Sequence, residues 1–277
     1  MSIKLMYITN QPHVARIAQA AGVDRVFVDM EYIGKDLRQG GMDTVKSHHT
    51  LEDLATVRAA VKRCEVLVRC NPIHDATKEH PGSAAEIEGI VAGGADVIML
   101  PFFKTVEEVR TFLELVNGRV RTCLLVETPE AVENIHEILA LPGIDEVLIG
   151  LNDLSLGYGR KFMFELLADG TVERLCRIFA EKGIPYGFGG IASLGRGMLP
   201  AEYVIKEHYR LGSTCAILSR SFCNANKVTD KSVLRSIFMD GVRQIRKLEL
   251  ECAEGRVDYL QNKQELHDIV AQIVEEK

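Results

Sequence analysis

Residues 121–130 read RTCLLVETPE and residues 145–156 read DEVLIGLNDLSL, and each stretch is an apolar run followed by a carboxylate. Glu127 closes the first run, and Asp153 follows the second after a segment whose apolar residues have helical spacing. This pattern predicts one strand–helix–strand unit of a parallel barrel, with both carboxylates at the C-terminal rim, where such folds carry their chemistry. Two hard oxygen ligands there suit Mg²⁺ or Mn²⁺; the plainer interpretation is a helix-capping Asp and a solvated Glu.

Similar apolar runs recur along the whole chain, separated by amphipathic segments. Runs rich in Val, Ile and Leu predict strands at residues 4–9, 25–30, 65–70, 96–102, 122–127, 146–150, 186–191 and 214–219. Strands that alternate with helices form a parallel sheet, and eight of them close into a (β/α)₈ TIM barrel of about 250 residues. The 277 residues therefore fit a single barrel domain. A doubly wound open sheet is the structural alternative, but no G-x-G-x-x-G motif follows the first strand.

Two more amphipathic segments, residues 230–253 and 257–275, follow the eighth run. One barrel needs a single helix at this point, so residues 228–277 are predicted to form extra C-terminal helices. These helices either pack on their own barrel or lie at the interface with a neighbouring subunit. An excess of apolar helix surface is most simply buried in a closed symmetric assembly, which favours a homo-oligomer.

Composition excludes several classes of protein. The net charge of −6 argues against nucleic acid and anionic membranes as partners, since both reward basic surfaces. No apolar run approaches the roughly 20 residues of a membrane span, and the N-terminus lacks a signal pattern. The seven cysteines are odd in number and form no CxxC pair, as expected of reduced thiols in a cytoplasmic protein.

Several segments together resemble those of a known family: GVDRVFVDMEY (22–32), VLVRCNP (66–72), GGADVIMLPFFKTVEEV (93–109) and LLVETPEAVENIHEILALPGIDEVLIGLNDLSLGYG (124–159). The family that they resemble is the HpcH/HpaI aldolase and citrate lyase β-subunit superfamily. The last segment is the most specific, because the ligand spacing, the helix and the Gly-x-Asn-Asp-Leu-Ser loop all match. The resemblance covers residues 5–222 and implies a metal-dependent C–C lyase that acts on pyruvate or a related 2-keto acid and an aldehyde, without a Schiff base.

The resemblance also implies roles for individual residues. Glu127 and Asp153 would hold Mg²⁺ or Mn²⁺, with Co²⁺ as a further candidate. Arg69 would contact the keto or enolate oxygen, and backbone amides near Gly150 and Asn152 would hold the substrate carboxylate. Swapped-helix dimers that build hexamers are implied as the assembly.

The chemistry explains why Arg69 suits this reaction. Cleavage of a β-hydroxy ketone leaves an enolate, so the site must stabilise a new negative charge. A divalent ion does this as a Lewis acid, and an always-protonated guanidinium adds a fixed donor on the same oxygen. The alternative for Arg69, a surface salt bridge, is unusual for an Arg that ends an apolar strand and precedes Asn-Pro.

The chain departs from the family pattern after its second strand. The family has His where this chain has Tyr32, and that His takes part in proton transfer. His48, His49, Tyr32 or a metal-bound water could accept the proton of the substrate's C4 hydroxyl, and His has the most suitable pKa. The alternative for the histidines is a solvated segment before a helix capped by Thr50. Of Asp29 and Glu31, one is expected to face the barrel mouth, where it orients a water or Arg69; a buried structural pair is the alternative.

Other cations and other functions stay open at this point. Arg196 and Arg220 follow the seventh and eighth strands, the usual anion-binding region of such barrels, although a flexible loop is the favoured interpretation of the segment with Arg196. Lys104 is a minor candidate for a Schiff-base lysine. An acyl-CoA lyase of the citrate or malyl type and a non-catalytic ligand-binding barrel are the alternatives to an aldolase. The sequence does not identify the aldehyde, the preferred metal or the direction of the reaction.

Overall fold

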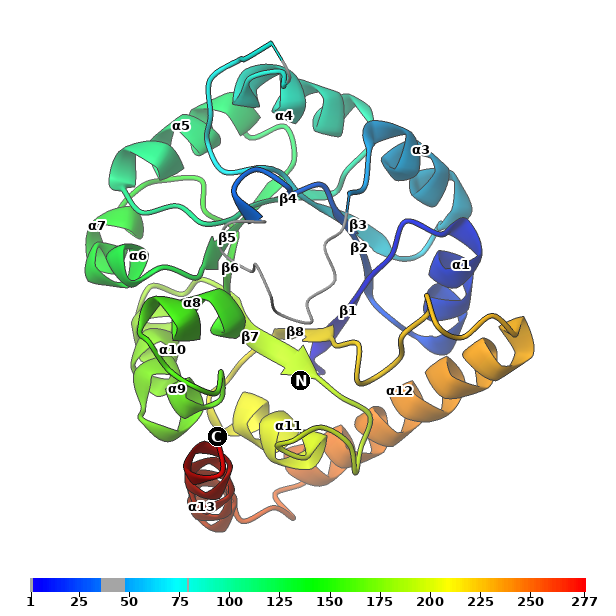
Figure 1. The fold of residues 1–277 in the computed structure, drawn as a ribbon, viewed down its shortest axis with the longest axis vertical. Helices are drawn as coiled ribbons and strands as arrows, with labels where there is room; N and C mark the ends of the chain where they lie inside the picture. The colour runs from blue at the N-terminus through cyan, green and yellow to red at the C-terminus, as the bar shows by residue number, and fades with distance from the viewer. Residues whose placement is uncertain (1, 36–47, 79) are drawn as a thin grey trace.

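The computed structural model describes residues 2–35, 48–78 and 80–277. These residues form eight parallel strands that close into a barrel in sequence order, with β8 beside β1 (Figure 1). The strands are β1 (Lys4–Ile8), β2 (Arg25–Asp29), β3 (Glu65–Arg69), β4 (Val97–Leu100), β5 (Arg121–Val126), β6 (Glu146–Ile149), β7 (Tyr186–Ile191) and β8 (Cys215–Leu218). Each lies within a predicted apolar run, apart from the first residue of β5, and the predicted (β/α)₈ barrel is confirmed.

Helices surround the strands on the outside of the barrel (Figure 1). They are α1 (Pro12–Ala21), α3 (Leu51–Ala60), α4 (Ser83–Ala92), α5 (Val106–Val116), α6 (Pro129–Glu133), α7 (Ile135–Ile138), α8 (Leu151–Gly157), α9 (Glu165–Ala168), α10 (Thr171–Glu181), α11 (Ala201–Arg210), α12 (Lys231–Ala253) and α13 (Tyr259–Glu275). Thr50 caps α3 as predicted, in a capping box with Asp53, because the two side chains satisfy each other's backbone N–H groups.

The inside of the barrel is filled in layers. Its apolar side chains come from the inward faces of the strands: Met6, Phe27, Leu67, Val97, Met99, Cys123, Leu125, Leu148 and Cys215. Near the N-terminal ends of the strands lies the fully buried Arg25, which contacts Glu146 at 2.6 Å and Glu65 at 2.7 Å. A buried charge is tolerated only when it is paired in this way. This filling leaves the opposite, C-terminal end of the barrel for the side chains described below.

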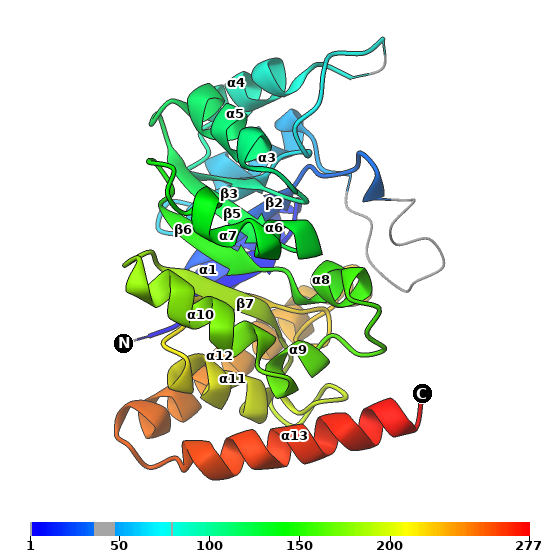
Figure 2. The ribbon, with the colours of Figure 1, turned by 90° about the vertical axis from the view of Figure 1, so that its left-hand side faces the viewer.

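The C-terminal helices pack on their own barrel. α12 lies against α1 and α11, in the place of the eighth barrel helix, and α13 lies against α11 and α9 (Figure 2). Leu266 and Val270 of α13 are buried in this contact, whereas Leu260 is 81% exposed. Contact of these helices with a second subunit stays a prediction. No helix within the described ranges is long and apolar enough to cross a membrane.

Candidate active site

Glu127 and Asp153 lie at the C-terminal ends of neighbouring strands. Glu127 follows β5 directly, and Asp153 lies in the first turn of α8, which follows β6. Glu127 is 4% and Asp153 is 8% exposed, and both line one cavity of about 230 Å³ at the mouth of the barrel, together with Arg69. They also line the adjoining cavity toward α6, beside Phe102. The structure therefore brings the two carboxylates together as the sequence predicts.

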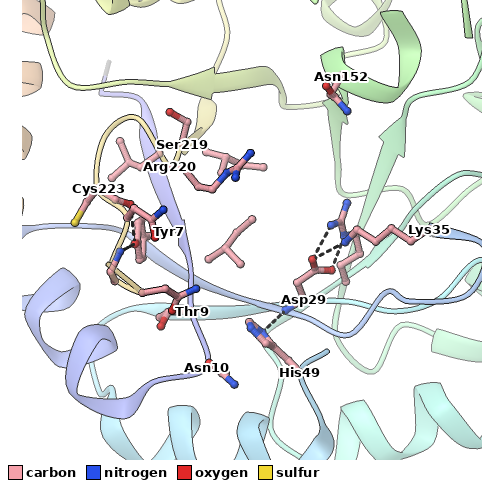
Figure 3. A pocket seen from close by; sticks show the side chains of 17 residues that line it. Tyr7, Thr9, Asn10, Asp29, Lys35, His49, Asn152, Ser219, Arg220 and Cys223 are labelled. Atoms are coloured by element: carbon pink, nitrogen blue, oxygen red, sulfur yellow. Dashed lines mark hydrogen bonds and ion pairs between the residues drawn. The ribbon is translucent and has the colours of Figure 1, made fainter. Parts of the chain in front are cut away.

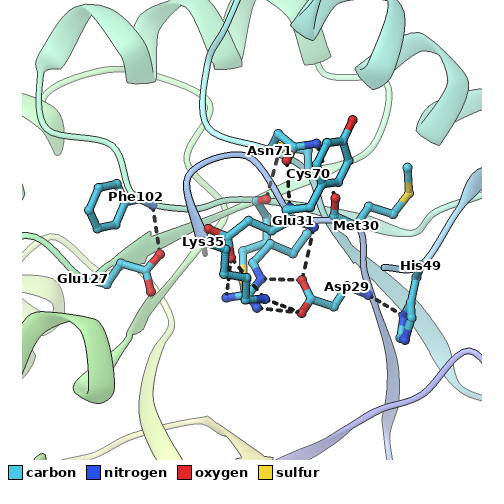
Figure 4. A network of polar contacts seen from close by, with 12 residues as sticks. Asp29, Met30, Glu31, Lys35, His49, Cys70, Asn71, Phe102 and Glu127 are labelled. Atoms are coloured by element: carbon cyan, nitrogen blue, oxygen red, sulfur yellow. Dashed lines mark hydrogen bonds and ion pairs between the residues drawn. The ribbon is translucent and has the colours of Figure 1, made fainter. Parts of the chain in front are cut away.

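A backbone amide fixes the orientation of the Glu127 carboxylate. The N–H of Phe102 donates a hydrogen bond of 2.9 Å to Glu127 Oε1 (Figure 4). Phe102 has a φ of 48°, in the left-handed region that residues other than glycine rarely adopt. Such backbone strain is concentrated at functional sites. Here it accompanies an amide that is directed at a candidate metal ligand.

The turn from β6 to α8 approaches the same carboxylate closely. A Cβ atom on Gly150 would lie 2.7 Å from Glu127 Oε2 and 2.8 Å from Glu127 Cβ, so only glycine fits. The N–H of Gly150 donates to the Val126 carbonyl over 2.9 Å and is therefore not free to hold a substrate carboxylate. The Asn152 side chain donates to Asp153 Oδ1 over 3.1 Å and lines the cavity, and binding of a substrate carboxylate by the backbone amides near Asn152 stays a prediction.

Arg69 is the centre of a four-residue ionic cluster. Its Nε and Nη2 atoms donate to the two carboxylate oxygens of Asp29, each over 2.8 Å, and its Nη1 lies 3.2 Å from Glu31. Lys35 Nζ lies 2.9 Å from Asp29 and 3.6 Å from Glu31 (Figure 4). β2 ends at Asp29, so strand alternation no longer applies and both carboxylates reach Arg69. Lys35 is buried, and sequence reasoning missed it.

The cluster holds Asp29 and Arg69 in their charged forms. Burial alone would raise the pKa of the Asp29 carboxyl, but Arg69 and Lys35 outweigh burial and lower that pKa below its ordinary value. Burial alone would lower the pKa of Arg69, but Asp29 and Glu31 raise it well above its ordinary value. The guanidinium also lies 5.6 Å from the centre of the Phe27 ring. Arg69 is therefore a fixed cation at the cavity, as an oxyanion donor must be.

Of the two predicted histidines, His49 lines a second cavity, which shares Arg69 and Asn152 with the first, and His48 is exposed. The N–H of Asp29 donates to His49 Nδ1 over 2.9 Å. Burial lowers the pKa of His49 and so favours the neutral ring. Because Nδ1 accepts this bond, the neutral ring carries its proton on Nε2. In this arrangement His49 can donate a hydrogen bond from Nε2, but it cannot accept a proton there.

Tyr32 is directed at a different part of the molecule. Its hydroxyl lies 3.2 Å from His80 Nδ1, and its backbone N–H donates to Asn71 Oδ1. Asn71 in turn donates to Glu86 over 2.7 Å, and burial raises the pKa of Glu86. Tyr32 and His80 are among the lining residues of neither cavity, and Asn71, which precedes Pro72, links the Tyr32 backbone to Glu86.

The other cations of the rim differ in position. Arg220, just past β8, lines a second cavity of about 330 Å³ that adjoins the first (Figure 3). Arg196 is exposed in the loop after β7. Lys104 Nζ lies 2.8 Å from Glu130, and Lys104 lines the cavity toward α6; its role as a Schiff-base lysine stays a minor prediction.

The carboxylate pair fits a hard divalent cation. Mg²⁺ and Mn²⁺ take oxygen ligands, and Mg²⁺ is commonly bound by one or two carboxylates together with waters and substrate oxygens. Glu127 and Asp153 are such a pair, and the cavity beside them supplies space for the remaining ligands. No group of three His, Cys, Asp or Glu side chains suited to a metal occurs among the described residues, so an all-protein zinc cage is not found in that part of the chain.

Together, the fold and the site define a parallel eight-stranded barrel with a carboxylate pair and a fixed arginine at its C-terminal mouth. The sequence matches the family described as HpcH/HpaI aldolase/citrate lyase over residues 4–165, more than half of the chain. The chain therefore belongs to this family, whose members are carbon–carbon lyases. No curated protein matches the sequence.

Two solved structures resemble the fold. One is an HpcH/HpaI aldolase from Desulfitobacterium hafniense DCB-2, with a TM-score of 0.58 and 19% identity over 88% of this chain and 93% of the other. The second is an HpcH/HpaI aldolase/citrate lyase family protein from Burkholderia cenocepacia J2315, with a TM-score of 0.56 and 15% identity over 92% of this chain and 95% of the other. At these identities the likeness concerns the fold alone.

Proposed function

We propose that this protein is a divalent-metal-dependent aldolase that cleaves or forms a 4-hydroxy-2-keto acid, with pyruvate or a related 2-keto acid and an aldehyde as the partners. The observation that carries the proposal is that Glu127, Asp153 and Arg69 line one cavity. Family membership supports a carbon–carbon lyase in general. The identity of the substrates and the dependence on a divalent metal go beyond what family membership supports.

In the proposed cleavage reaction, the C3–C4 bond breaks and its electron pair stays on C3 as the enolate. The C4 hydroxyl loses its proton and becomes the aldehyde carbonyl. When bound by Glu127 and Asp153, the divalent ion would act as a Lewis acid on the 2-keto acid. Arg69 holds the negative oxygen of the enolate, and its ion pairs with Asp29 and Glu31 keep the guanidinium in place while charge develops.

Arg69, Lys35 and His49 present hydrogen-bond donors at the mouth of the barrel. Arg69 and Lys35 are paired with carboxylates, and His49 presents Nε2–H. The hydroxyl proton is therefore expected to leave to water in the cavity. These donors would in turn stabilise the oxygen of the departing aldehyde. The proposed reaction requires no Schiff base.

A substrate panel tests the proposal. Purified protein is incubated with pyruvate or oxaloacetate and a set of aldehydes, with EDTA and after addition of Mg²⁺, Mn²⁺ or Co²⁺, and the products are identified by mass spectrometry. Condensation products that require the metal support the proposal. A parallel set of acyl-CoA esters tests the citrate-type alternative, which the family description also covers. Absence of turnover in every arm would favour a non-catalytic barrel.

A further inference from the structure

The backbone that follows β2 carries two members of the ionic cluster around Arg69. Asp29 and Arg69 are the last paired residues of β2 and β3. Beyond this pair, Glu31 lies 3.2 Å from Arg69, and Lys35 lies 2.9 Å from Asp29. Both side chains are buried. The course of the backbone after β2 therefore decides where these two charges lie.

One side chain, that of Asn71, holds this backbone beyond the end of the strand. Asn71 Oδ1 accepts hydrogen bonds from the N–H groups of Tyr32 and Ile33, each over 2.9 Å. Its Nδ2 donates to the Met30 carbonyl over 3.3 Å (Figure 4). Backbone groups that are withdrawn from water need such partners. A single amide thus supplies partners for three backbone groups and fixes the course of the segment.

The orientation of the Asn71 amide is set by Glu86, a buried residue of α4. Glu86 Oε1 accepts from Asn71 Nδ2 over 2.7 Å and from the Asn71 backbone N–H over 3.2 Å. An ionised carboxylate has only acceptor atoms, so it faces the NH₂ group and turns Oδ1 toward the N–H groups of Tyr32 and Ile33. The Asn71 side chain then makes all four hydrogen bonds of which it is capable.

We propose that Asn71 and Glu86 are positioning residues of the active site. Through the backbone after β2 they place the Glu31 and Lys35 side chains at the cluster that holds the Arg69 guanidinium. Neither Asn71 nor Glu86 lines the two cavities that Arg69 lines, so their effect on the reaction is indirect. The inference rests on the proposed function in one respect, which is that Arg69 acts on the substrate.

Reversal of the hydrogen bond between Asn71 and Glu86 tests the proposal. Asn71→Asp keeps the acceptor for the two N–H groups but replaces Nδ2, which lies 2.7 Å from Glu86, by a second carboxylate oxygen. When Glu86→Gln is added, the glutamine can turn its NH₂ group to that oxygen. Its carbonyl then accepts from the backbone N–H of residue 71, as Glu86 Oε2 does over 3.3 Å. The double variant restores the link with the opposite polarity.

Asn262→Asp is the matched control. Asn262 of α13 is buried, and its Nδ2 donates to the buried Glu207 over 3.1 Å and to the Tyr203 carbonyl over 3.3 Å. The substitution therefore creates the same pair of neighbouring carboxylates between α11 and α13, outside the barrel (Figure 2). Both single variants should lose stability in urea unfolding, whereas only Asn71→Asp should change Arg69.

The first readout is the Arg69 guanidinium in substrate-free protein. Labelling with ¹⁵N-arginine gives its Nε–H signal in NMR spectra, and Arg69→Lys assigns that signal. Exchange of this proton with water should be faster by about tenfold or more in Asn71→Asp, because the cluster opens more often. It should stay at the wild-type rate in Asn262→Asp and return toward that rate in the double variant. Asn71→Ser adds no charge beside Glu86 and gives the same comparison if Asn71→Asp does not fold.

The second readout is turnover of a 4-hydroxy-2-keto acid. Arg69 is proposed to act on the charge that develops in the transition state, so its displacement should lower kcat more than it changes KM. We expect kcat to fall by about a hundredfold in Asn71→Asp, while KM changes by less than about threefold. The double variant should regain at least about tenfold of this loss, and Asn262→Asp should keep the wild-type kcat.

The two readouts separate the positioning role from the proposed function. Faster exchange at Arg69 in Asn71→Asp, with no turnover by any protein including wild type, would support the positioning role and refute the proposed function alone. Wild-type exchange in Asn71→Asp and Asn71→Ser, an equal change in Asn262→Asp, or no recovery in the double variant overturns the positioning role. An unchanged kcat in Asn71→Asp, when wild-type protein is active, overturns it as well.

Discussion

Replacement of Asp29 by Asn would remove one charge from the cluster that fixes Arg69. Asp29 is 1% exposed and contacts both Arg69 and Lys35 within 2.9 Å. Breaking a buried ion pair costs about 3–5 kcal/mol, because the remaining charge is left buried without its partner. Glu31 still faces both cations. We therefore expect a loss near the lower end, about 3 kcal/mol, which lowers Tm by roughly 5–10 °C in a chain of this size.

The effect of Asp29→Asn should depend on pH in a defined direction. The folded-state pKa of Asp29 lies below its ordinary value. Its contribution to stability is therefore fully present above the ordinary carboxyl pKa of about 3.9 and is lost as pH falls through the lower folded-state pKa. The stability difference between wild type and variant should be largest near pH 7 and should shrink below about pH 4.

Urea unfolding of both proteins between pH 7 and pH 3 measures this difference. Asp240→Asn is the control, since Asp240 forms an exposed pair with Arg243 on α12 and should contribute less than about 1 kcal/mol. A free energy of unfolding for Asp29→Asn within about 1 kcal/mol of wild type at pH 7 would refute the reasoning. So would a difference that does not change between pH 7 and pH 3.

Three further predictions concern the site and the assembly. Arg69→Lys keeps the charge but not the planar fork, so kcat should fall by about 10²-fold while calorimetry shows unchanged metal binding; an unchanged kcat would assign Arg69 to structure. Gly150→Ala places a Cβ atom 2.7 Å from Glu127 Oε2, so metal affinity should fall by about tenfold or more with little change in the circular dichroism spectrum; wild-type affinity would show that the turn can move. Deletion of residues 257–277 should shift the mass measured by light scattering to smaller species, and a full-length monomer would contradict the predicted oligomer.

The fold was predictable because its signals are local. Apolar runs of five to seven residues mark the strands, and Glu127 and Asp153 stand out because one closes such a run and the other follows one. Eight strands in alternation with helices leave few topologies, and the end of a parallel strand fixes the rim of the barrel to which a residue belongs. Arg69 was found by the same reasoning, since it is the last residue of β3.

The contacts of individual side chains were less predictable, because they depend on how loops fold back. Lys35 follows β2 by six residues, and nothing in its sequence position shows that it reaches Asp29. Tyr32 occupies the family's His position, yet its hydroxyl faces His80. His49 was a predicted candidate, but only the hydrogen bond from Asp29 shows which ring nitrogen carries the proton. The side to which a strand residue points follows from the alternation along the strand. The contacts of a loop residue follow only from the three-dimensional structure.

The central claim is that Glu127 and Asp153 together hold the divalent ion on which turnover depends. Isothermal calorimetry of Mn²⁺ binding to EDTA-treated wild type, Glu127→Gln and Asp153→Asn, paired with turnover of a 4-hydroxy-2-keto acid, tests it most directly. We expect one ion per chain in wild type, loss of binding and of turnover in both variants, and unchanged circular dichroism spectra. Full turnover by metal-free wild-type protein, or wild-type Mn²⁺ affinity in both variants, would contradict the claim.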